Sequence, residues 1–245
     1  PTNVDRPNVA ISYEVFDGDI AMGTGLVTGC KCNLTGLKAG DHNMSVRAIG
    51  DGTRYVDSDI SSVISFTKLE KPGISVDKAN NRYVWNNIAG ATSYYLRIGN
   101  GKEYAEPNDV DKDCSYVPVF KSAGTYSVTI KSIGDGKRYI DSDEETITQV
   151  VKKLKTPSAT ARYSSDVVDI NNGMITVDIV TPSDNCTLYS FTIDNVTETG
   201  KTGELSYSRV IKSTGVIAIS VKALGGDFDE NGTYYLESDS CSVGN

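Results

Sequence analysis

The chain has 245 residues, with 24 Lys and Arg against 32 Asp and Glu, so its formal net charge is −8. An acidic surface repels nucleic acids and anionic lipids, and no apolar run reaches the roughly 20 residues of a membrane-spanning helix. We therefore expect no nucleic-acid partner and no membrane insertion.

The predicted elements are strands throughout the chain. Near the start, alternate residues mark the buried face of a strand: His42, Met44, Val46 and Ala48. In the middle, a core aromatic residue at Trp85 precedes two alternating runs: Tyr94, Leu96 and Ile98, then Tyr126, Val128, Ile130 and Ser132. Near the end the alternating residues are Ile217, Ile219, Val221 and Ala223. A period of two is typical of strands packed on one side, and no segment has the 3.6-residue period of a helix.

Three parts of the chain resemble one another. Each contains a strand, a glycine-rich turn and an acidic triplet, within residues 43–59, 127–143 and 218–239. A Lys-Leu-x-x-Pro segment begins at Lys68 and again at Lys153, in the same order relative to these parts. Landmarks that recur in order at nearly one period predict tandem modules.

Many short strands with frequent turn signals predict a two-sheet sandwich in each module. We expect the modules at residues 1–67, 68–152 and 153–245, the first of them lacking its first strand. The linkers are very short, because the last strand of one module runs almost directly into the Lys-Leu-x-x-Pro segment of the next. Short linkers favour a semi-rigid row of modules.

The middle module resembles a fibronectin type III domain. The matching positions are Pro72, Trp85, Tyr94 and residues 123–130. The segment Ile-Gly-Asp-Gly-x-Arg-Tyr-x-Asp-Ser-Asp is also similar to repeats of bacterial surface and secreted proteins and of phage proteins. The resemblance implies an all-β fold of three tandem immunoglobulin-like (fibronectin type III-like) β-sandwiches, on a bacterial cell surface or the exterior of a phage virion.

The resemblance has a gap and a departure. Aligning Ala10 with Ala91 places Val4 opposite Trp85 and leaves no counterpart for residues 69–81. The first module should then contain unpaired backbone groups and an open groove, to be filled by sequence before Pro1 or by a strand from another chain. The family's corner tyrosine is present only in the middle module, as the three matching positions show: His42, Tyr126 and Ile217. Its hydrogen bond is therefore expected only there.

Candidate sites are few. His42 is the one histidine, and a Ser-His-Asp triad would need it beside a carboxylate and an activated hydroxyl. Because it occupies the inward position of Tyr126 and Ile217, we expect a structural role. The five cysteines contain no CxxC pair and are expected to be small buried hydrophobic residues: Cys30, Cys32, Cys114, Cys186 and Cys241.

The acidic triplets are the most regular polar feature: residues 57–59, 141–143 and 237–239, with Asp51 and Asp135 in the adjoining turn. Calcium takes six to eight oxygen ligands, but the spacing is not that of a calcium loop. We expect Asp and Ser side chains to bond local backbone amides, with a calcium-stiffened adhesin as an alternative. The candidate tyrosines for stacking on sugar rings are Tyr95, Tyr104 and Tyr207, although an isolated surface tyrosine more often reflects strand propensity.

These observations predict no catalytic, cofactor-binding or metal-binding residue and a protein that is not an enzyme. The first hypothesis is a non-catalytic structural or adhesive repeat region of an exterior protein, acting as a spacer and a weak binding surface. Its partners would be other protein subunits of a surface or virion assembly, and surface glycans. The alternative is a carbohydrate-binding accessory region of a larger secreted enzyme.

Overall fold

The computed structural model describes residues 12–23, 27–28, 31–34, 36–99, 102–107, 114–165, 173–212 and 215–243, without the side chains of residues 23, 27–28 and 102–107. The chain packs as two compact units: residues 1–74, 85–114 and 129–146, and residues 75–84, 115–128 and 147–245. This division passes through the middle repeat. The predicted boundaries at 67/68 and 152/153 therefore remain predictions.

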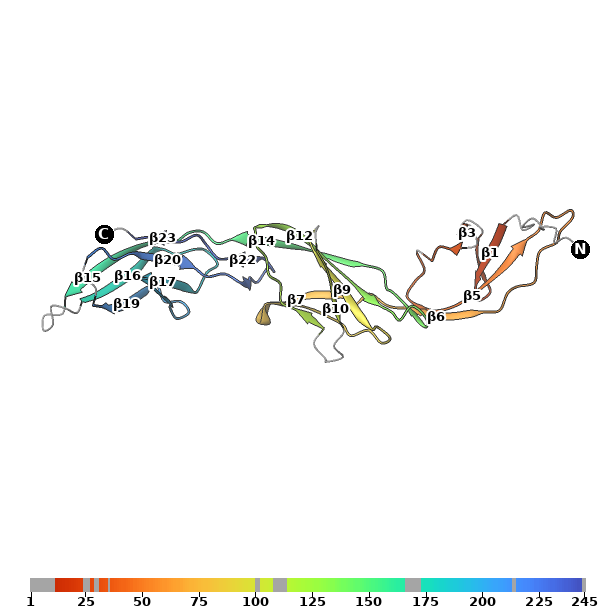
Figure 1. Ribbon diagram of the computed structural model, residues 1–245, viewed down its shortest axis with the longest axis horizontal. Coiled ribbons are helices and arrows are strands. Elements are labelled where there is room, and N and C mark those ends of the chain that lie inside the picture. Colours follow the sequence, from red (N-terminus) through yellow and green to blue (C-terminus); the bar gives the residue numbers. More distant parts are fainter. Residues whose placement is uncertain are drawn as a thin grey trace, which may run out of the picture. The chain divides into compact units, whose positions relative to one another are not determined.

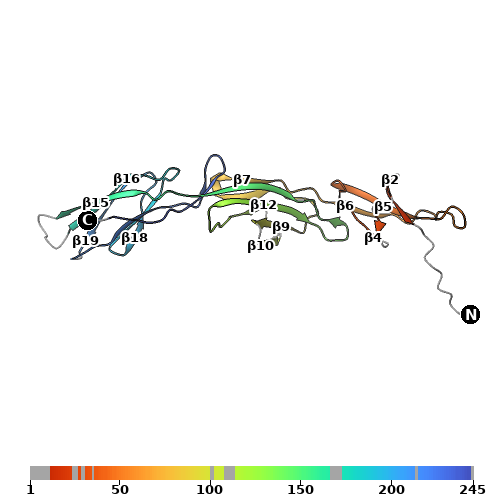
Figure 2. The same ribbon diagram turned by 90° about the horizontal axis from the view of Figure 1, so that it is seen from above.

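The first repeat is built on one antiparallel sheet (Figure 2). Its strands, in spatial order, are β6 (Ile64–Lys68), β5 (Gly40–Ile49), β1 (Ser12–Asp17) and β2 (Ile20–Gly23). A separate pair is formed by β3 (Val27–Thr28) and β4 (Lys31–Cys32). The core that the described residues of this repeat bury is small and is formed by Val15, Leu37, Met44 and Phe66.

The middle repeat has two sheets (Figure 1). One contains β11 (Ser115–Tyr116), β8 (Arg82–Trp85) and β7 (Ile74–Asp77). The other contains β10 (Lys102–Pro107), β9 (Ser93–Ile98), β12 (Gly124–Ile133) and β14 (Glu145–Lys153). The rings of Trp85 and Tyr94 meet edge to face at 5.7 Å, so β8 packs against β9 of the second sheet.

The third repeat follows the same plan. One sheet contains β15 (Ser158–Ser165), β16 (Gly173–Thr181) and β19 (Ser206–Ile211). The other contains β18 (Val196–Thr199), β17 (Tyr189–Ile193), β20 (Ile219–Ala223) and β23 (Cys241–Ser242). Val177, Phe191 and Val221 come from both sheets and are almost completely buried in one core. This is the two-sheet sandwich that alternation predicts.

The fold is all-β, as predicted, with immunoglobulin-like sandwiches in tandem. The described residues contain strands and a single three-residue 3-10 helix, Lys78–Asn80. Among them, no helix is both long and apolar enough to cross a membrane.

The predicted strand faces hold in the middle and third repeats but not throughout the first. Val128, Ile130 and Ser132 are fully buried, as expected for one face of β12. Val46 of β5 should be equally buried, yet it is 37% exposed. That prediction is wrong because no described strand covers this part of the first repeat's sheet.

Candidate functional site: junction loops and an open groove

The loop that follows the long strand of each repeat is folded by its own aspartate. We call it the junction loop: residues 50–59, 134–143 and 225–239. Oδ1 of Asp51 accepts the amides of Thr53, Arg54 and Tyr55 at 2.7–2.9 Å. These bonds stabilise the charged carboxylate, so they lower the pKa of Asp51 to about 2.

The same arrangement recurs in the other two loops. Oδ1 of Asp135 accepts the amides of residues 137–139, and Oδ1 of Asp229 accepts those of Asn231 and Thr233. The bonds from Tyr139, Lys137 and Arg138 also lower the pKa of Asp135. The repeated aspartate is thus an intraloop hydrogen-bond acceptor.

The serine of each acidic triplet fastens the loop to the long strand. The Oγ atoms of Ser58, Ser142 and Ser238 accept the amides of Ala48, Ser132 and Ala223 at 2.9–3.0 Å. Each hydroxyl also donates to the carbonyl of the next residue. The prediction that the triplets bond local backbone amides is confirmed.

A Ser142→Ala variant should lower the free energy of unfolding of the middle repeat by about 1–3 kcal/mol, because the fully buried amide of Ser132 loses its acceptor. Ser58→Ala is the matched control, since the same bond is exposed in the first repeat and should cost less than about 0.5 kcal/mol. Amide exchange in β12 and in β5 measures the free-energy costs of Ser142→Ala and of Ser58→Ala. Equal effects would show that burial of this bond does not matter.

The acidic oxygens do not converge on a metal-sized site. Within the described ranges, no three Asp, Glu, His or Cys side chains are grouped so that they could hold a metal ion. The first acid of each triplet instead lies beside a cation on the long strand: Arg47–Asp57, Lys131–Asp141 and Lys222–Glu237.

The junction loop of the middle repeat also joins the repeat before it. Its strand β13 (Tyr139–Ile140) pairs in parallel with Thr67 and Lys68 at the end of β6, visible in Figure 1 where the green loop reaches the orange strand. The amide of Thr67 donates to the Arg138 carbonyl at 2.8 Å, and the amide of Leu69 donates to the Ile140 carbonyl at 3.1 Å. The end of one repeat therefore adds a strand to the loop of the next.

A buried lysine completes this junction. Lys68 is only 5% exposed, and its Nζ donates to Asp143 Oδ1 at 2.6 Å and to the Leu37 carbonyl at 2.7 Å. Burial of an ammonium group requires such partners. Asp143, the last acid of the triplet, thus forms an ion pair that joins the end of β6 to the junction loop of the middle repeat.

The junction with the third repeat is built in the same way. Its strands are β21 (Asp227–Phe228) and β22 (Tyr234–Leu236), and β22 pairs in parallel with residues 151–153 of β14. The amide of Leu154 donates to the Leu236 carbonyl at 2.9 Å, and Lys153 Nζ lies 2.5 Å from Asp239 Oδ1.

A buried glutamine adds to this second junction. Nε2 of Gln149 donates to the Gly232 carbonyl at 2.8 Å, and its Oε1 accepts the hydroxyl of Tyr83 at 2.9 Å. Gln149 therefore links strand β8 of the middle repeat to the loop of the third.

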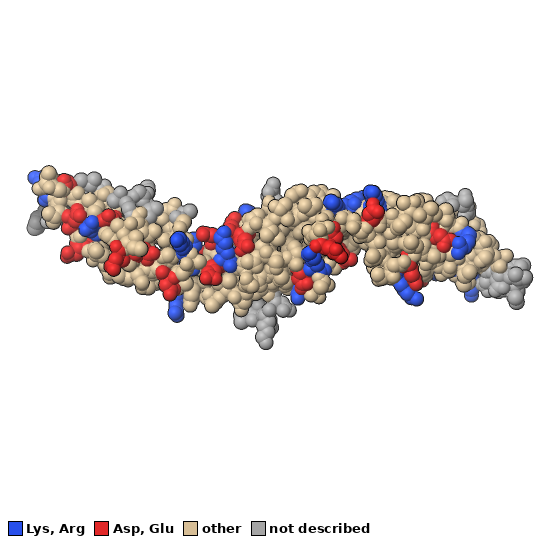
Figure 3. All heavy atoms as spheres, turned by 180° about the vertical axis from the view of Figure 1, so that it is seen from behind, with Lys and Arg blue, Asp and Glu red and all other residues tan. Residues whose placement is uncertain are grey.

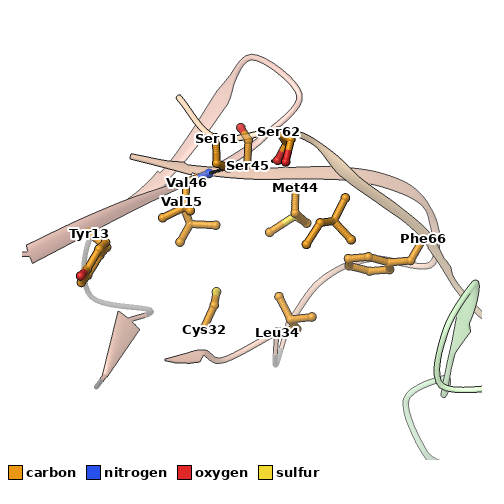
Figure 4. Close-up of a pocket in the computed structure, with 11 residues that line it drawn as sticks. Tyr13, Val15, Cys32, Leu34, Met44, Ser45, Val46, Ser61, Ser62 and Phe66 are labelled. Carbon is orange, nitrogen blue, oxygen red and sulfur yellow. Dashed lines mark hydrogen bonds between the residues drawn. The ribbon is translucent and has the colours of Figure 1, made fainter. Parts of the chain in front are cut away.

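The first repeat contains an open apolar groove of about 590 Å³. Figure 4 shows Val15 and Met44 pointing into this space from the sheet, with Cys32 and Leu34 on the opposite side. Tyr13, Val46, Ile64 and Phe66 also line it. The groove expected from the missing counterpart of residues 69–81 is present, whereas Pro1, Val4 and Ala10 lie outside the described residues.

His42 lies at the inward position that the sequence predicts. It is buried and its ring tilts against Phe66 at 5.5 Å. Nδ1 lies 2.7 Å from the carboxylate of Asp17, and Nε2 donates to the Lys38 carbonyl at 2.9 Å. Both partners accept, which favours the doubly protonated ring. A carboxylate does orient the imidazole, but its other nitrogen is bonded to a carbonyl rather than to a hydroxyl.

The corner hydrogen bond is more widespread than predicted. Tyr126 donates to the carbonyl of Ser122 at 2.8 Å, as expected in the middle repeat. The expectation that the first repeat lacks this bond is wrong, because His42 donates to Lys38, also four residues upstream. An imidazole N–H replaces the phenol in the same role.

The charge of His42 should stabilise the first repeat below neutral pH. Burial lowers the pKa of His42, but hydrogen bonds to Asp17 and to the Lys38 carbonyl outweigh it, so its pKa lies above the ordinary 6.5. A raised folded-state pKa contributes stability below pH of about 6.5 that is lost as pH rises through the folded value. Titrating the single imidazole by NMR should give this raised pKa, and Asp17→Asn should lower it. An unshifted pKa in the wild type would contradict the geometry.

The cysteines and tyrosines give mixed outcomes. Cys32 is exposed at the groove, so the expectation of burial is wrong for it; Cys114, Cys186 and Cys241 are half-buried, and all four are free thiols. Cys30 lies outside the described residues. Of the candidate sugar-stacking tyrosines, Tyr207 stacks on Phe191 with its hydroxyl 2.5 Å from Glu198, and Tyr95 lies under the Lys131 ammonium. The side chain of Tyr104 is not described.

Charged residues of both signs are interspersed on the face drawn in Figure 3, without a broad basic patch among its described residues. The exposed ion pairs of the chain include Arg162–Asp178 and Lys155–Asp184. Exposed pairs add little stability, so this face is a mixed polar surface.

No protein-family model and no curated protein matches the chain. Solved structures similar to it include chicken CNTN1 domains FN1–FN3, with 14% identity, a TM-score of 0.31 and coverage of 82% of this chain and 77% of that one. The central fibronectin-III array of RIM-binding protein has 13% identity, a TM-score of 0.23 and coverage of 97% and 88%. The BSP domain of a biofilm associated protein has 13% identity, a TM-score of 0.25 and coverage of 84% and 42%.

These likenesses are too weak to carry an argument, and the fold rests on strand order. In the middle and third repeats, a three-stranded sheet faces a second sheet that contains four strands of the same repeat. These two repeats are immunoglobulin-like β-sandwiches in fold. The structural feature that all three repeats share is the junction loop, which no motif for catalysis or metal binding would have indicated.

Proposed function

We propose that this chain is a non-catalytic structural and adhesive repeat region of an exterior protein, on a bacterial cell or a phage virion. The observation that carries the proposal is the repeated junction. Both junctions combine a parallel strand pair with a Lys–Asp ion pair, Lys68–Asp143 and Lys153–Asp239. A chain whose recurrent motif joins successive repeats is suited to act as a spacer.

The surface supports a role in weak binding. Large apolar side chains such as Val119 and Val216 are exposed outside the strands, where they are open to contact by a partner. The partners proposed are other protein subunits of a surface or virion assembly, together with surface glycans. Binding through exposed loops fits a scaffold whose loops carry function while the strands hold them.

Labelling of intact source cells or particles with an antibody against the chain tests the exterior location. We expect labelling without lysis, and labelling only after lysis would contradict the proposal. The spacer role is tested by small-angle X-ray scattering of the chain and of an Asp143→Asn, Asp239→Asn variant. Loosened junctions should broaden the distribution of interatomic distances, and an unchanged distribution would show that the ion pairs do not hold the repeats.

A further inference from the structure

The first repeat has a complete junction loop, but among the described residues no strand pairs with its Tyr55 and Val56. Asp51 and Ser58 hold this loop in the same way as their counterparts hold the other two. Yet Val56 is 90% exposed and Tyr55 is 43% exposed, whereas their counterparts Ile140 and Tyr139 are half-buried in strand β13. The loop therefore has the same internal hydrogen bonds as the two loops that pair with a parallel strand, although no described strand pairs with it.

One acid of this loop also lacks an ion-pair partner among the described residues. Asp59 is the counterpart of Asp143 and Asp239, which pair with Lys68 and Lys153 at the ends of β6 and β14. No described cation forms an ion pair with Asp59. The loop thus presents an acid where a preceding lysine would lie.

The apolar groove is a second open feature of the same repeat, as its described residues show. In the middle repeat, Trp85 of β8 packs on Tyr94, the counterpart of Tyr13, and Tyr83 of β8 bonds to Gln149, the counterpart of Ile64. Tyr13 and Ile64 both line the groove, and Ile64 is 68% exposed. The groove therefore lies where the first strands of a repeat belong.

In the other two repeats, one continuous segment both pairs with the junction loop and continues into the first strand of the sandwich. Residues 67–68 pair with the junction loop at β13, and the chain then runs through Leu69 into β7. Residues 151–153 pair with β22, and the chain then runs through Leu154 into β15. The pairing and the sandwich strands are thus supplied by a single stretch of polypeptide.

We propose that the first repeat binds the last strand and linker of a further repeat of this kind as one extended segment. Its backbone pairs in parallel with Tyr55 and Val56, its lysine pairs with Asp59, and its alternate apolar side chains enter the groove. The interface continues a contact made twice within the chain, and the acid–lysine complementarity identifies the occupant. The proposal holds whether or not the chain lies on an exterior surface.

The test extends the full chain with a copy of its own residues 64–81 placed before Pro1. Pro1 is the counterpart of Arg82, so this extension keeps the repeat spacing. Amide exchange at Tyr55–Val56 and maleimide labelling of Cys32 report the loop and the groove separately, with Cys186 in the third repeat as the internal reference. We expect both to slow at least tenfold while Cys186 labelling is unchanged.

Two variants of the copied segment give the specificity. Lys68→Glu in the copy should restore fast exchange at Tyr55–Val56, and adding Asp59→Lys to the chain should slow it again. Ile74→Asp with Val76→Asp in the copy should restore Cys32 labelling. Unchanged exchange and labelling on extension would overturn the proposal. Protection of Cys32 alone would also overturn it, since a strand would then fill the groove without the junction.

Discussion

A Gly134→Ala variant is expected to lower the free energy of unfolding of the middle repeat by at least about 3 kcal/mol. A Cβ at Gly134 would overlap the carbonyl oxygen of Tyr139, a backbone atom that cannot move without opening the junction loop. Overpacking strain of roughly 1–3 kcal/mol adds to lost loop and junction hydrogen bonds of about 1 kcal/mol each. A Cβ added at Gly50 or at Gly225 would likewise overlap the carbonyl oxygen of Tyr55 or of Tyr235.

Gly136→Asn is the control for this prediction. Gly136 has a φ of 68° and nothing near the position of a Cβ, and asparagine tolerates this left-handed conformation. Amide exchange in β12 and around Thr67 and Leu69 would follow the repeat and its junction in both variants. If Gly134→Ala were as mild as Gly136→Asn, close approach of the two backbone segments would not explain the repeated glycine.

Much of the fold follows from the sequence because a strand packed on one side must alternate. Val128 and Ile130 of β12, and Ile219 and Val221 of β20, are buried as the period of two predicts. The local role of the acidic triplets was also predictable, since Asp and Ser side chains readily bond nearby amides. These inferences depend only on residues close together in the chain.

The junctions were beyond sequence reasoning for a physical reason. Nothing local indicates that Tyr139 and Ile140 pair with Thr67 and Lys68, because a parallel pair joins segments far apart in the chain and needs no turn signal. The corner bond from His42 was not predicted because the family's corner residue is a tyrosine, and here an imidazole N–H replaces its phenol. A Lys and an Asp that recur at fixed places in successive repeats were the available signal.

An Ile130→Ala variant should cost about 2–5 kcal/mol, the usual range for a large-to-small change at a fully buried position. Its counterpart in the first repeat, Val46→Ala, should cost less than about 1 kcal/mol, because Val46 is already 37% exposed and lines the groove. Site-resolved amide exchange in β12 and β5 would give both free energies within one chain. Similar costs at the two positions would show that the groove is closed in solution.

The cost of Val46→Ala also reports whether the copied segment fills the groove. When the copy of residues 64–81 is placed before Pro1, Val46 should become buried like Ile130, and Val46→Ala should cost roughly 1.5 kcal/mol at ~0.8 kcal/mol per carbon removed. This increase in the cost of Val46→Ala depends on apolar side chains filling the groove and not merely on a longer chain. It should therefore disappear when Ile74 and Val76 of the copy are changed to Asp, and a rise that survived that change would mean that the segment stabilises the repeat without entering the groove.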